Sequence, residues 1–258
     1  MKPYSFTIFT RQSKAKDSEI DFLCQGLLDL GFTLDDDNPE LIIVVGGDGS
    51  LLKAIHEFNF NGLFLLINSG HLGFFSDYSI GELSNFMDDI VDSDPIIEDL
   101  PLLKININGE ENYALNDLVI QAGRTCEFNL SINNIHFTSS RASGIVVGTA
   151  VSSTGYLASL NAPIVVSDPG IYMYSFIAPV FNRLFPNTIS KAILSTNDVL
   201  SISASDPYEI SLDGIPMNKD NECEVSILLS STKEVKLLHL KEVSNINRIR
   251  KSISEIED

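Results

Sequence analysis

Residues 45–50 read Val-Gly-Gly-Asp-Gly-Ser and directly follow the apolar run of residues 41–44, Leu-Ile-Ile-Val. A short run of β-branched and aliphatic residues that ends at glycines predicts a buried strand that enters a tight turn. Because glycine lacks a Cβ, the backbone at Gly46, Gly47 and Gly49 can adopt positive φ and approach a ligand closely. The N–H groups of such a turn can converge on phosphate oxygens. We therefore expect a phosphate-binding turn at the end of this strand.

Asp48 lies inside this glycine-rich turn, where its carboxylate would repel a phosphate. One interpretation is functional: the carboxylate serves as a base or a metal partner in phosphoryl transfer. The other is structural: the aspartate forms an Asx-turn with its own backbone. Ser50 is the expected N-cap of a helix after the turn, whose N-terminus would add positive potential. These residues alone leave both interpretations of Asp48 open.

Strand and helix signals alternate through the first hundred residues. The expected strands are residues 4–9, 41–45 and 63–67, and the expected helices are residues 17–30, 50–58 and 80–91. Alternation of this kind predicts a parallel sheet covered by helices on both faces, with ligands at the carboxyl ends of the strands. We therefore expect a Rossmann-like α/β domain over residues 1–95.

After Pro95 the pattern changes to short strand-like segments separated by turn signals. These segments are residues 102–107, 113–121, 127–132, 144–148, 199–203, 208–212, 224–229 and 234–240. Asn108-Gly109, Asn133-Asn134 and Asp213-Gly214 are typical hairpin turns. The pattern predicts a mainly antiparallel β-sandwich domain over residues 96–240. Residues 243–256 have helical spacing, so residues 241–258 are expected to form a closing helix that packs back on the N-terminal domain.

Charge and cysteine content exclude several classes of function. The formal net charge of −18 disfavours binding to nucleic acids or anionic membranes, which would repel the chain. Cys24, Cys126 and Cys223 form no CxxC pair and the histidines show no ligand spacing, so neither a disulfide framework nor a protein-bound metal is expected. Reduced thiols, together with the lack of a signal peptide and of a long apolar run, favour a cytoplasmic protein.

Polar residues also interrupt apolar sequence at four later places: residues 68–75, Asn116-Asp117, residues 148–156 and Asp213-Gly214. Each has an ordinary structural explanation. Asn116-Asp117 fits a β-bulge, Asp213-Gly214 fits a hairpin turn, and the hydroxyls of residues 148–156 fit a helix cap. Taken singly, none of these segments indicates a function.

Taken together and in this order, the segments resemble those of the bacterial NAD kinases. The residues that carry the resemblance are Gly46-Gly47-Asp48-Gly49-Ser50, Asn68-Ser69-Gly70-His71-Leu72-Gly73-Phe74, Asn116-Asp117, Ser153-Thr154-Gly155-Tyr156 and Asp213-Gly214. Lipid kinases share the first element but not the whole series. The resemblance implies phosphorylation of the adenosine-ribose 2′-hydroxyl of NAD to give NADP. It also implies ATP or polyphosphate as donor, Mg²⁺ that accompanies ATP, and a homodimer or homotetramer.

The resemblance further implies a role for each matching residue. Asp48 would orient or deprotonate the hydroxyl, and Asp213 would be a second carboxylate near the reacting end. The remaining implied contacts are Gly46, Gly47, Gly49 and Ser50 for phosphates; Phe74, Asn116, Ser153, Thr154 and Tyr156 for the adenosine; Asp117 for the nicotinamide ribose; and Ser159 for the ligand generally.

Several positions depart from the family pattern, among them Val151 and Gly155 in the Ser/Thr segment, and two of them concern the nicotinamide half of NAD. Asp117 stands where a glutamate is usual, and Ser143 stands where an aspartate is usual. Both changes shorten the reach toward the nicotinamide half of NAD. They keep open a second interpretation, a dinucleotide-binding protein of the same fold with weak or no catalysis. A lipid kinase is a third, which the acidic charge opposes. The donor, the choice of NAD or NADH and the oligomeric state stay open.

Overall fold

The structure is a computed structural model that describes residues 4–11, 14–70, 73–167, 170–185, 188–205, 208–217 and 224–253. Of residues 251–253 only the backbone is described. The chain divides into two compact units. Unit 1 comprises residues 1–100 and 234–258, and unit 2 comprises residues 101–233. The sequence predicted boundaries after residues 95 and 240. The boundaries differ because β6 (Ile96–Ile107) and β15 (Val225–His239) each begin in one unit and end in the other.

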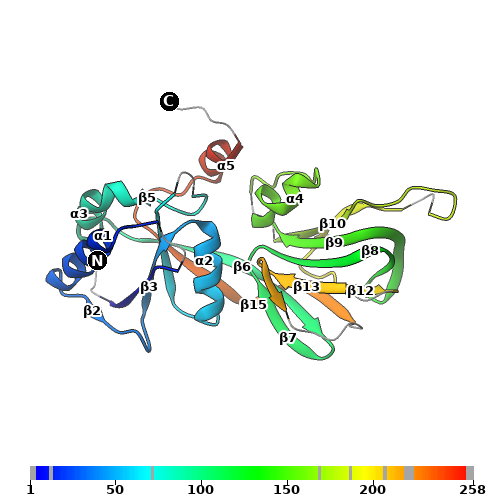
Figure 1. The fold of residues 1–258 in the computed structure, drawn as a ribbon, viewed down its shortest axis with the longest axis horizontal. Helices are drawn as coiled ribbons and strands as arrows, with labels where there is room; N and C mark the ends of the chain where they lie inside the picture. Colours follow the sequence, from blue (N-terminus) through cyan, green and yellow to red (C-terminus); the bar gives the residue numbers. More distant parts are fainter. Residues whose placement is uncertain are drawn as a thin grey trace. The chain divides into compact units, whose positions relative to one another are not determined.

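Unit 1 is built on a parallel sheet with strand order β2-β1-β3-β4-β15, and β5 also pairs with β4 (Figure 1). Its elements are β1 (Ser5–Phe9), α1 (Asp17–Asp29), β2 (Thr33–Leu34), β3 (Leu41–Gly46), α2 (Asp48–Glu57), β4 (Leu63–Asn68), β5 (Tyr78–Ser79), the 3₁₀ turn η1 (Ile80–Glu82), α3 (Leu83–Asp92) and α5 (Asn245–Ile253). The expected alternation of parallel strands and helices is present in this unit.

Helices cover both faces of this sheet. Leu41, Ile43 and Val45 of β3 pack in one core with buried side chains of α1 and α3. Because successive side chains of a strand point to opposite faces, Ile42 and Val44 face the other way, where α2 packs on β3 and β4. Strands buried on both faces explain why β3 and β4 read as continuous apolar runs.

Unit 2 consists almost entirely of strands. Its elements are β6, β7 (Glu110–Ala114), β8 (Asp117–Ile132), β9 (Ile135–Thr149), η2 (Val151–Thr154), α4 (Tyr156–Ser159), β10 (Ile171–Ile177), β11 (Lys191–Ser195), β12 (Leu200–Ala204), β13 (Tyr208–Leu212), β14 (Ile215–Met217) and β15. The long strand β8 pairs with β9 along one edge, and its other edge pairs with β13 near its start and with β12 near its end, all antiparallel. Side chains from these strands surround one hydrophobic core.

Several local predictions are confirmed in unit 2, and others are wrong. Both residues of each pair Asn108-Gly109, Asn133-Asn134 and Asp213-Gly214 have positive φ, as two-residue hairpin turns require. The expected strands 113–121 and 127–132 are instead the end of β7 and one long strand, β8, with register shifts against β9. The sequence missed β10, whose run Ile-Tyr-Met-Tyr-Ser-Phe-Ile shows no alternation because side chains on both of its faces are buried.

The C-terminal helix α5 covers residues 245–253, shorter than the expected 243–256, of which residues 254–256 lie outside the described part. Arg248 on this helix donates to Glu98, so the helix packs on unit 1. None of the described helices is both long and apolar enough to cross a lipid bilayer.

Candidate functional site

The glycine-rich turn connects β3 to α2 and differs in detail from the expectation. The helix begins at Asp48, two residues earlier than expected, and its N-cap is Gly47, whose carbonyl accepts the N–H groups of Ser50 and Leu51 at 2.8 and 3.1 Å. The prediction that Ser50 is the N-cap is therefore wrong, because the backbone of Gly47 already starts the helix. The strand–turn–helix itself is present.

The glycines of this turn do not adopt positive φ, so that expectation is also wrong. Position 46 requires glycine for a steric reason, because a Cβ added to Gly46 would lie 2.3 Å from the buried Ser50 Oγ. At Gly47 and Gly49 an added Cβ would meet no atom within 4 Å. The backbone at these two positions is therefore open to an approaching ligand.

The carboxylate of Asp48 is held by a second segment of unit 1, the turn at Phe74 and Phe75. Asp48 Oδ2 accepts the Phe74 N–H at 3.0 Å, and Oδ1 accepts the Phe75 N–H at 3.2 Å. These partners lie 26 and 27 residues away along the chain, so the carboxylate is bound by a distant turn. An Asx-turn does not account for Asp48. The structure also brings Asp48 and Phe74 together, whereas His71 and Leu72 of the same segment lie outside the described residues.

The environment of Asp48 raises its pKa above the usual value, chiefly because burial disfavours the charged carboxylate. The N–H groups of Phe74 and Phe75 and the positive charge of Arg248 act in the opposite direction. A carboxylate that is partly desolvated and fixed at both oxygens is suited to take a proton from a bound hydroxyl.

In unit 2, Asp213 organises the turn that carries Asn116 and Asp117. Asp213 Oδ2 accepts the Leu115 N–H at 2.8 Å, and Oδ1 accepts the N–H groups of Asn116 and Asp117 at 2.7 and 3.1 Å. Both carboxylate oxygens are therefore bonded to backbone donors. This gives Asp213 a structural role that the sequence did not predict.

Asp117 is buried beside Ser152, whose hydroxyl donates to Asp117 Oδ2 at 2.8 Å. Burial raises the pKa of Asp117 to about 6, the Ser152 hydroxyl acts to lower it, and the negative charge of Asp213 raises it further. Ser152 was not among the expected site residues, although it belongs to the expected Ser/Thr segment. Its contribution depends on a contact across 35 residues of chain, which local sequence does not reveal.

The raised pKa of Asp117 predicts a pH-dependent effect of Asp117→Asn on stability. The folded state binds the Asp117 proton more tightly than the unfolded state does. Protonated Asp117 therefore makes its full contribution to the stability of the wild type below the ordinary pKa of 3.8, and this contribution is lost as the pH rises through about 6. We expect Asp117→Asn to raise the free energy of unfolding by about 3 kcal/mol at pH 8 relative to wild type, since the pKa of Asp117 is raised by roughly two units and each unit corresponds to about 1.4 kcal/mol. The gain should be nearly absent at pH 4. Urea unfolding at both pH values measures it, with the exposed Asp37→Asn as control. Equal gains at both pH values would contradict this account.

Asn116 presents a buried polar atom for which the described residues supply no hydrogen-bond donor. Its Oδ1 atom is inaccessible to solvent and has no hydrogen-bond partner among the described residues. Buried carbonyl oxygens are normally satisfied, so an exception needs an explanation. A donor supplied by a ligand, such as an exocyclic amino group, would satisfy it.

The expected Ser/Thr segment forms η2 and α4, and its side chains have different tasks. Ser153 is buried and its Oγ accepts the Val165 N–H at 3.0 Å. Thr154 Oγ1 and Ser159 Oγ donate to the carbonyls of Val151 and Tyr156 at 3.2 and 2.7 Å. Tyr156 is 38% exposed at the start of α4. Of these side chains, the tyrosine ring is therefore the one available to stack on a ligand.

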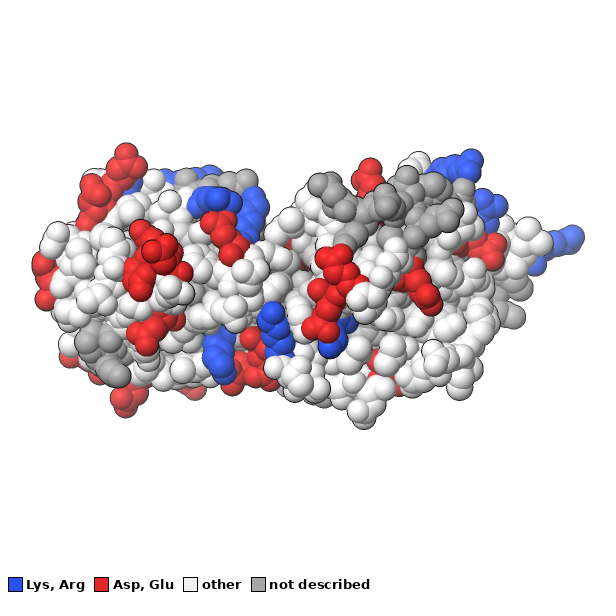
Figure 2. Space-filling model, turned by 90° about the horizontal axis from the view of Figure 1, so that it is seen from below, with Lys and Arg blue, Asp and Glu red and all other residues white. Residues whose placement is uncertain are grey.

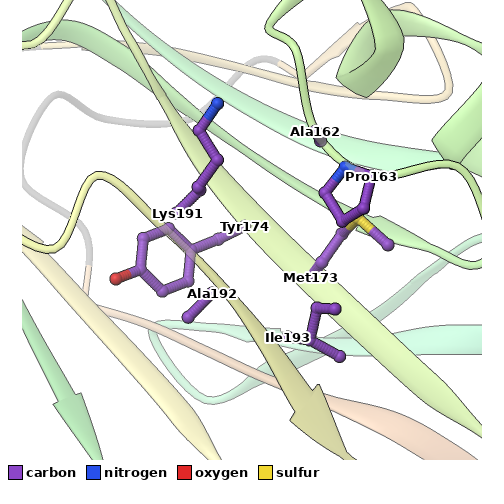
Figure 3. Close-up of a pocket in the computed structure, with 7 residues that line it drawn as sticks. All are labelled: Ala162, Pro163, Met173, Tyr174, Lys191, Ala192 and Ile193. Atoms are coloured by element: carbon purple, nitrogen blue, oxygen red, sulfur yellow. The ribbon is translucent and has the colours of Figure 1, made fainter.

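Unit 2 also contains a cavity of about 310 Å³ lined by Ala162, Pro163, Met173, Tyr174, Lys191, Ala192 and Ile193 (Figure 3). None of the expected site residues lines it. The Lys191 ammonium is already bonded to the carbonyls of Leu160 and Asn161 at 3.0 and 2.9 Å, and the Tyr174 hydroxyl to the carbonyl of Ile189 at 2.8 Å. The polar groups of this cavity are therefore engaged by the protein.

The distribution of charged side chains is a further guide to a site, on one face and among the described residues. On the face shown in Figure 2, acidic side chains are scattered, and basic side chains form only small groups. Within the described parts of the chain, no three His, Cys, Asp or Glu side chains lie close enough together to hold a metal ion.

Comparison with known proteins finds relatives of this chain by sequence, although not through a family model. No family model matches the chain. It is 29% identical over 225 residues to NAD kinase 1 of Bacillus cereus, a match that covers 82% of this chain and 84% of the relative. It is 27% identical over 241 residues to the NAD kinase of Staphylococcus aureus, covering 88% of this chain and 90% of the relative.

Solved structures extend the likeness to the fold. The crystal structure of an NAD kinase from Archaeoglobus fulgidus in complex with ATP superposes with a TM-score of 0.76 at 18% identity, covering 97% of this chain and 99% of that chain. Yeast NADH kinase complexed with NADH gives a TM-score of 0.79 at 18% identity, covering 98% of this chain and 88% of that chain. The two-unit α/β fold is therefore shared with both.

Proposed function

Because this chain belongs to the NAD kinase family, we propose that it transfers the γ-phosphoryl group of ATP to the adenosine-ribose 2′-hydroxyl of NAD, giving NADP and ADP. The observation that carries the proposal is the carboxylate of Asp48, which lies in the glycine-rich turn and is fixed by the N–H groups of Phe74 and Phe75.

Asp48 is the proposed catalytic base. The hydroxyl oxygen of the ribose forms a bond to the γ-phosphorus, the bond from that phosphorus to the β–γ bridging oxygen breaks, and the hydroxyl proton passes to Asp48. Phosphoryl transfer depends mainly on position and charge. A carboxylate held at both oxygens can be aimed at the hydroxyl at little further entropic cost. The raised pKa of Asp48 makes it a better proton acceptor than an ordinary aspartate.

The turn around Asp48 is proposed to bind phosphates. Gly47 and Gly49 leave the backbone uncovered, and Gly46 allows Ser50 to pack against the turn. The N-terminus of the ten-residue helix α2 supplies N–H groups and positive potential to the same region. We propose that Mg²⁺ enters bound to ATP and offsets phosphate charge, as in phosphoryl transfer generally, without being held by the protein.

The turn of Asn116 and Asp117 is proposed to bind the dinucleotide. The buried Oδ1 of Asn116, which finds no donor in the described part of the chain, would accept a hydrogen bond from the adenine amino group. Asp117, oriented by Ser152, would accept hydrogen bonds from ribose hydroxyls. The exposed ring of Tyr156 would stack on the adenine, with Phe74, Ser153, Thr154 and Ser159 in supporting roles.

Further features of the proposal follow from the family. We propose that unit 2 is a β-sandwich, that unit 1 is Rossmann-like, and that the protein acts as a homodimer or homotetramer. NAD and NADH are both candidate substrates, and polyphosphate is an alternative donor.

The direct test is a coupled assay with the full-length protein, ATP, Mg²⁺ and NAD, in which NADP formation is followed with an NADP-specific dehydrogenase. We expect NADP to form. Parallel reactions replace NAD by NADH or by diacylglycerol, and calorimetry measures NAD binding. Binding of NAD without formation of NADP would favour the dinucleotide-binding alternative, and phosphorylation of the lipid alone would overturn the proposal.

A further inference from the structure

Four ionisable side chains of unit 1 form a connected cluster that the proposed reaction does not use. They are Asp77, Glu98 on β6, His239 on β15 and Arg248 on α5. His239 Nδ1 lies 3.0 and 3.1 Å from the carboxylate oxygens of Asp77, and its Nε2 lies 3.1 Å from Glu98 Oε2. Arg248 Nη1 donates to both oxygens of Glu98 at 2.9 and 3.0 Å.

This cluster is largely shielded from water. The side chains of His239 and Arg248 are 1% and 11% exposed, and those of Asp77 and Glu98 are 15% and 19% exposed. Buried ionic groups are costly unless each finds partners. Two carboxylates face one guanidinium and one imidazole, so the charges balance when His239 is protonated. The guanidinium is thus fixed in a defined position.

Arg248 also contacts the turn that holds Asp48. Its guanidinium carbon lies 5.8 Å from the ring centroids of both Phe74 and Phe75, within the range of a cation–π interaction. These are the residues whose N–H groups bind the Asp48 carboxylate at 3.0 and 3.2 Å. A chain of contacts therefore runs from α5 through two aromatic rings to Asp48.

We propose that Arg248 is a positioning residue for the reaction: held by Glu98, it fixes the Phe74–Phe75 turn and thereby the carboxylate of Asp48. The proposal rests on the proposed function, in which Asp48 is the base. Arg248 also contributes charge, because its positive charge lowers the pKa of Asp48 against the burial that raises it. A second prediction follows: loss of this charge should move the Asp48 titration to higher pH.

The test compares Arg248→Met, which removes charge and planar shape, with Arg248→Lys, which keeps the charge but not the guanidinium fork. We expect Arg248→Met to lower kcat about tenfold, the scale of a small misplacement of a catalytic group, with less than about a threefold change in KM for NAD. The acidic limb of the kcat–pH profile should move upward. Arg248→Lys should keep the limb near its wild-type position and lose less kcat. The exposed Arg250→Gln on the same helix is the matched control, expected to leave kcat and the limb unchanged.

A second readout does not depend on activity. The Asp48 carboxyl titration, followed by ¹³C NMR in wild type, Arg248→Met and Arg250→Gln, should shift upward only in Arg248→Met, at a temperature where all three are folded. An unshifted titration together with kcat within twofold of wild type would overturn the proposal. If the wild type forms no NADP, the proposed function fails by itself, and the NMR comparison still decides whether Arg248 acts on Asp48.

Discussion

Asp48→Asn is expected to reduce the turnover of NAD about 100-fold or more, the scale of lost general-base assistance. The amide cannot accept the hydroxyl proton, although its Oδ1 can still bind one of the two N–H groups that hold the wild-type carboxylate. The KM for NAD should change little, because all the groups proposed to bind the dinucleotide except Phe74 lie in unit 2. Steady-state kinetics over a range of NAD concentrations separates the two constants.

The change at Asp48 also affects structure, so a control is needed. The amide nitrogen would face the second N–H group, at a cost of about 1 kcal/mol for one lost hydrogen bond. Melting temperatures of Asp48→Asn and of the exposed Asp37→Asn establish how much of the loss is structural. If the folded Asp48→Asn protein keeps more than about half of the wild-type turnover, Asp48 is not the base.

Asp213→Ala should lower the free energy of unfolding by about 3–5 kcal/mol. Three backbone N–H groups, of Leu115, Asn116 and Asp117, would lose their acceptor, and each buried donor left without a partner costs about 1–3 kcal/mol. Asp213 also has φ +50°, a conformation that alanine adopts less readily than Asp or Asn. NAD binding should weaken as well, because the turn that carries Asn116 and Asp117 loses its anchor.

Asp213→Asn is the matched comparison. Asparagine tolerates positive φ and keeps one carbonyl oxygen as an acceptor, so we expect a loss clearly smaller than that of Asp213→Ala. Urea unfolding and calorimetric NAD titration of both variants provide the measurements. A loss below about 1 kcal/mol in Asp213→Ala would mean that water or local rearrangement replaces the carboxylate.

Local sequence predicted the features that depend on short stretches of chain. The apolar run of β3 and the glycines after it predicted a strand, a turn and a helix with Asp48 between them, and the Asn-Gly type pairs predicted hairpin turns. These features follow from backbone freedom and from the alternation of side chains, which are readable in a few residues.

The features that the sequence did not predict depend on contacts between distant segments. Phe74 was expected to contact the adenosine; that its backbone N–H binds Asp48 was not predicted, because a backbone donor has no residue-type signature. The contacts of Ser152 with Asp117, and of Arg248 with Glu98, join residues 35 and 150 positions apart. No local pattern identifies either pair.

The strand β15 imposes an order on how the polypeptide can complete its fold during synthesis. Residues 236 and 237 of this strand pair with Leu63 and Phe64 at the start of β4, whereas β5 pairs with Ile67 and Asn68 at its end. In the sheet built by the first hundred residues, the start of β4 therefore lacks this neighbour until all of unit 2 has been translated. Until then β4 presents unpaired backbone groups in an apolar strand, a template for pairing with other chains. A nascent or truncated chain that stops at residue 233 should therefore need chaperone protection, and it would also lack Arg248.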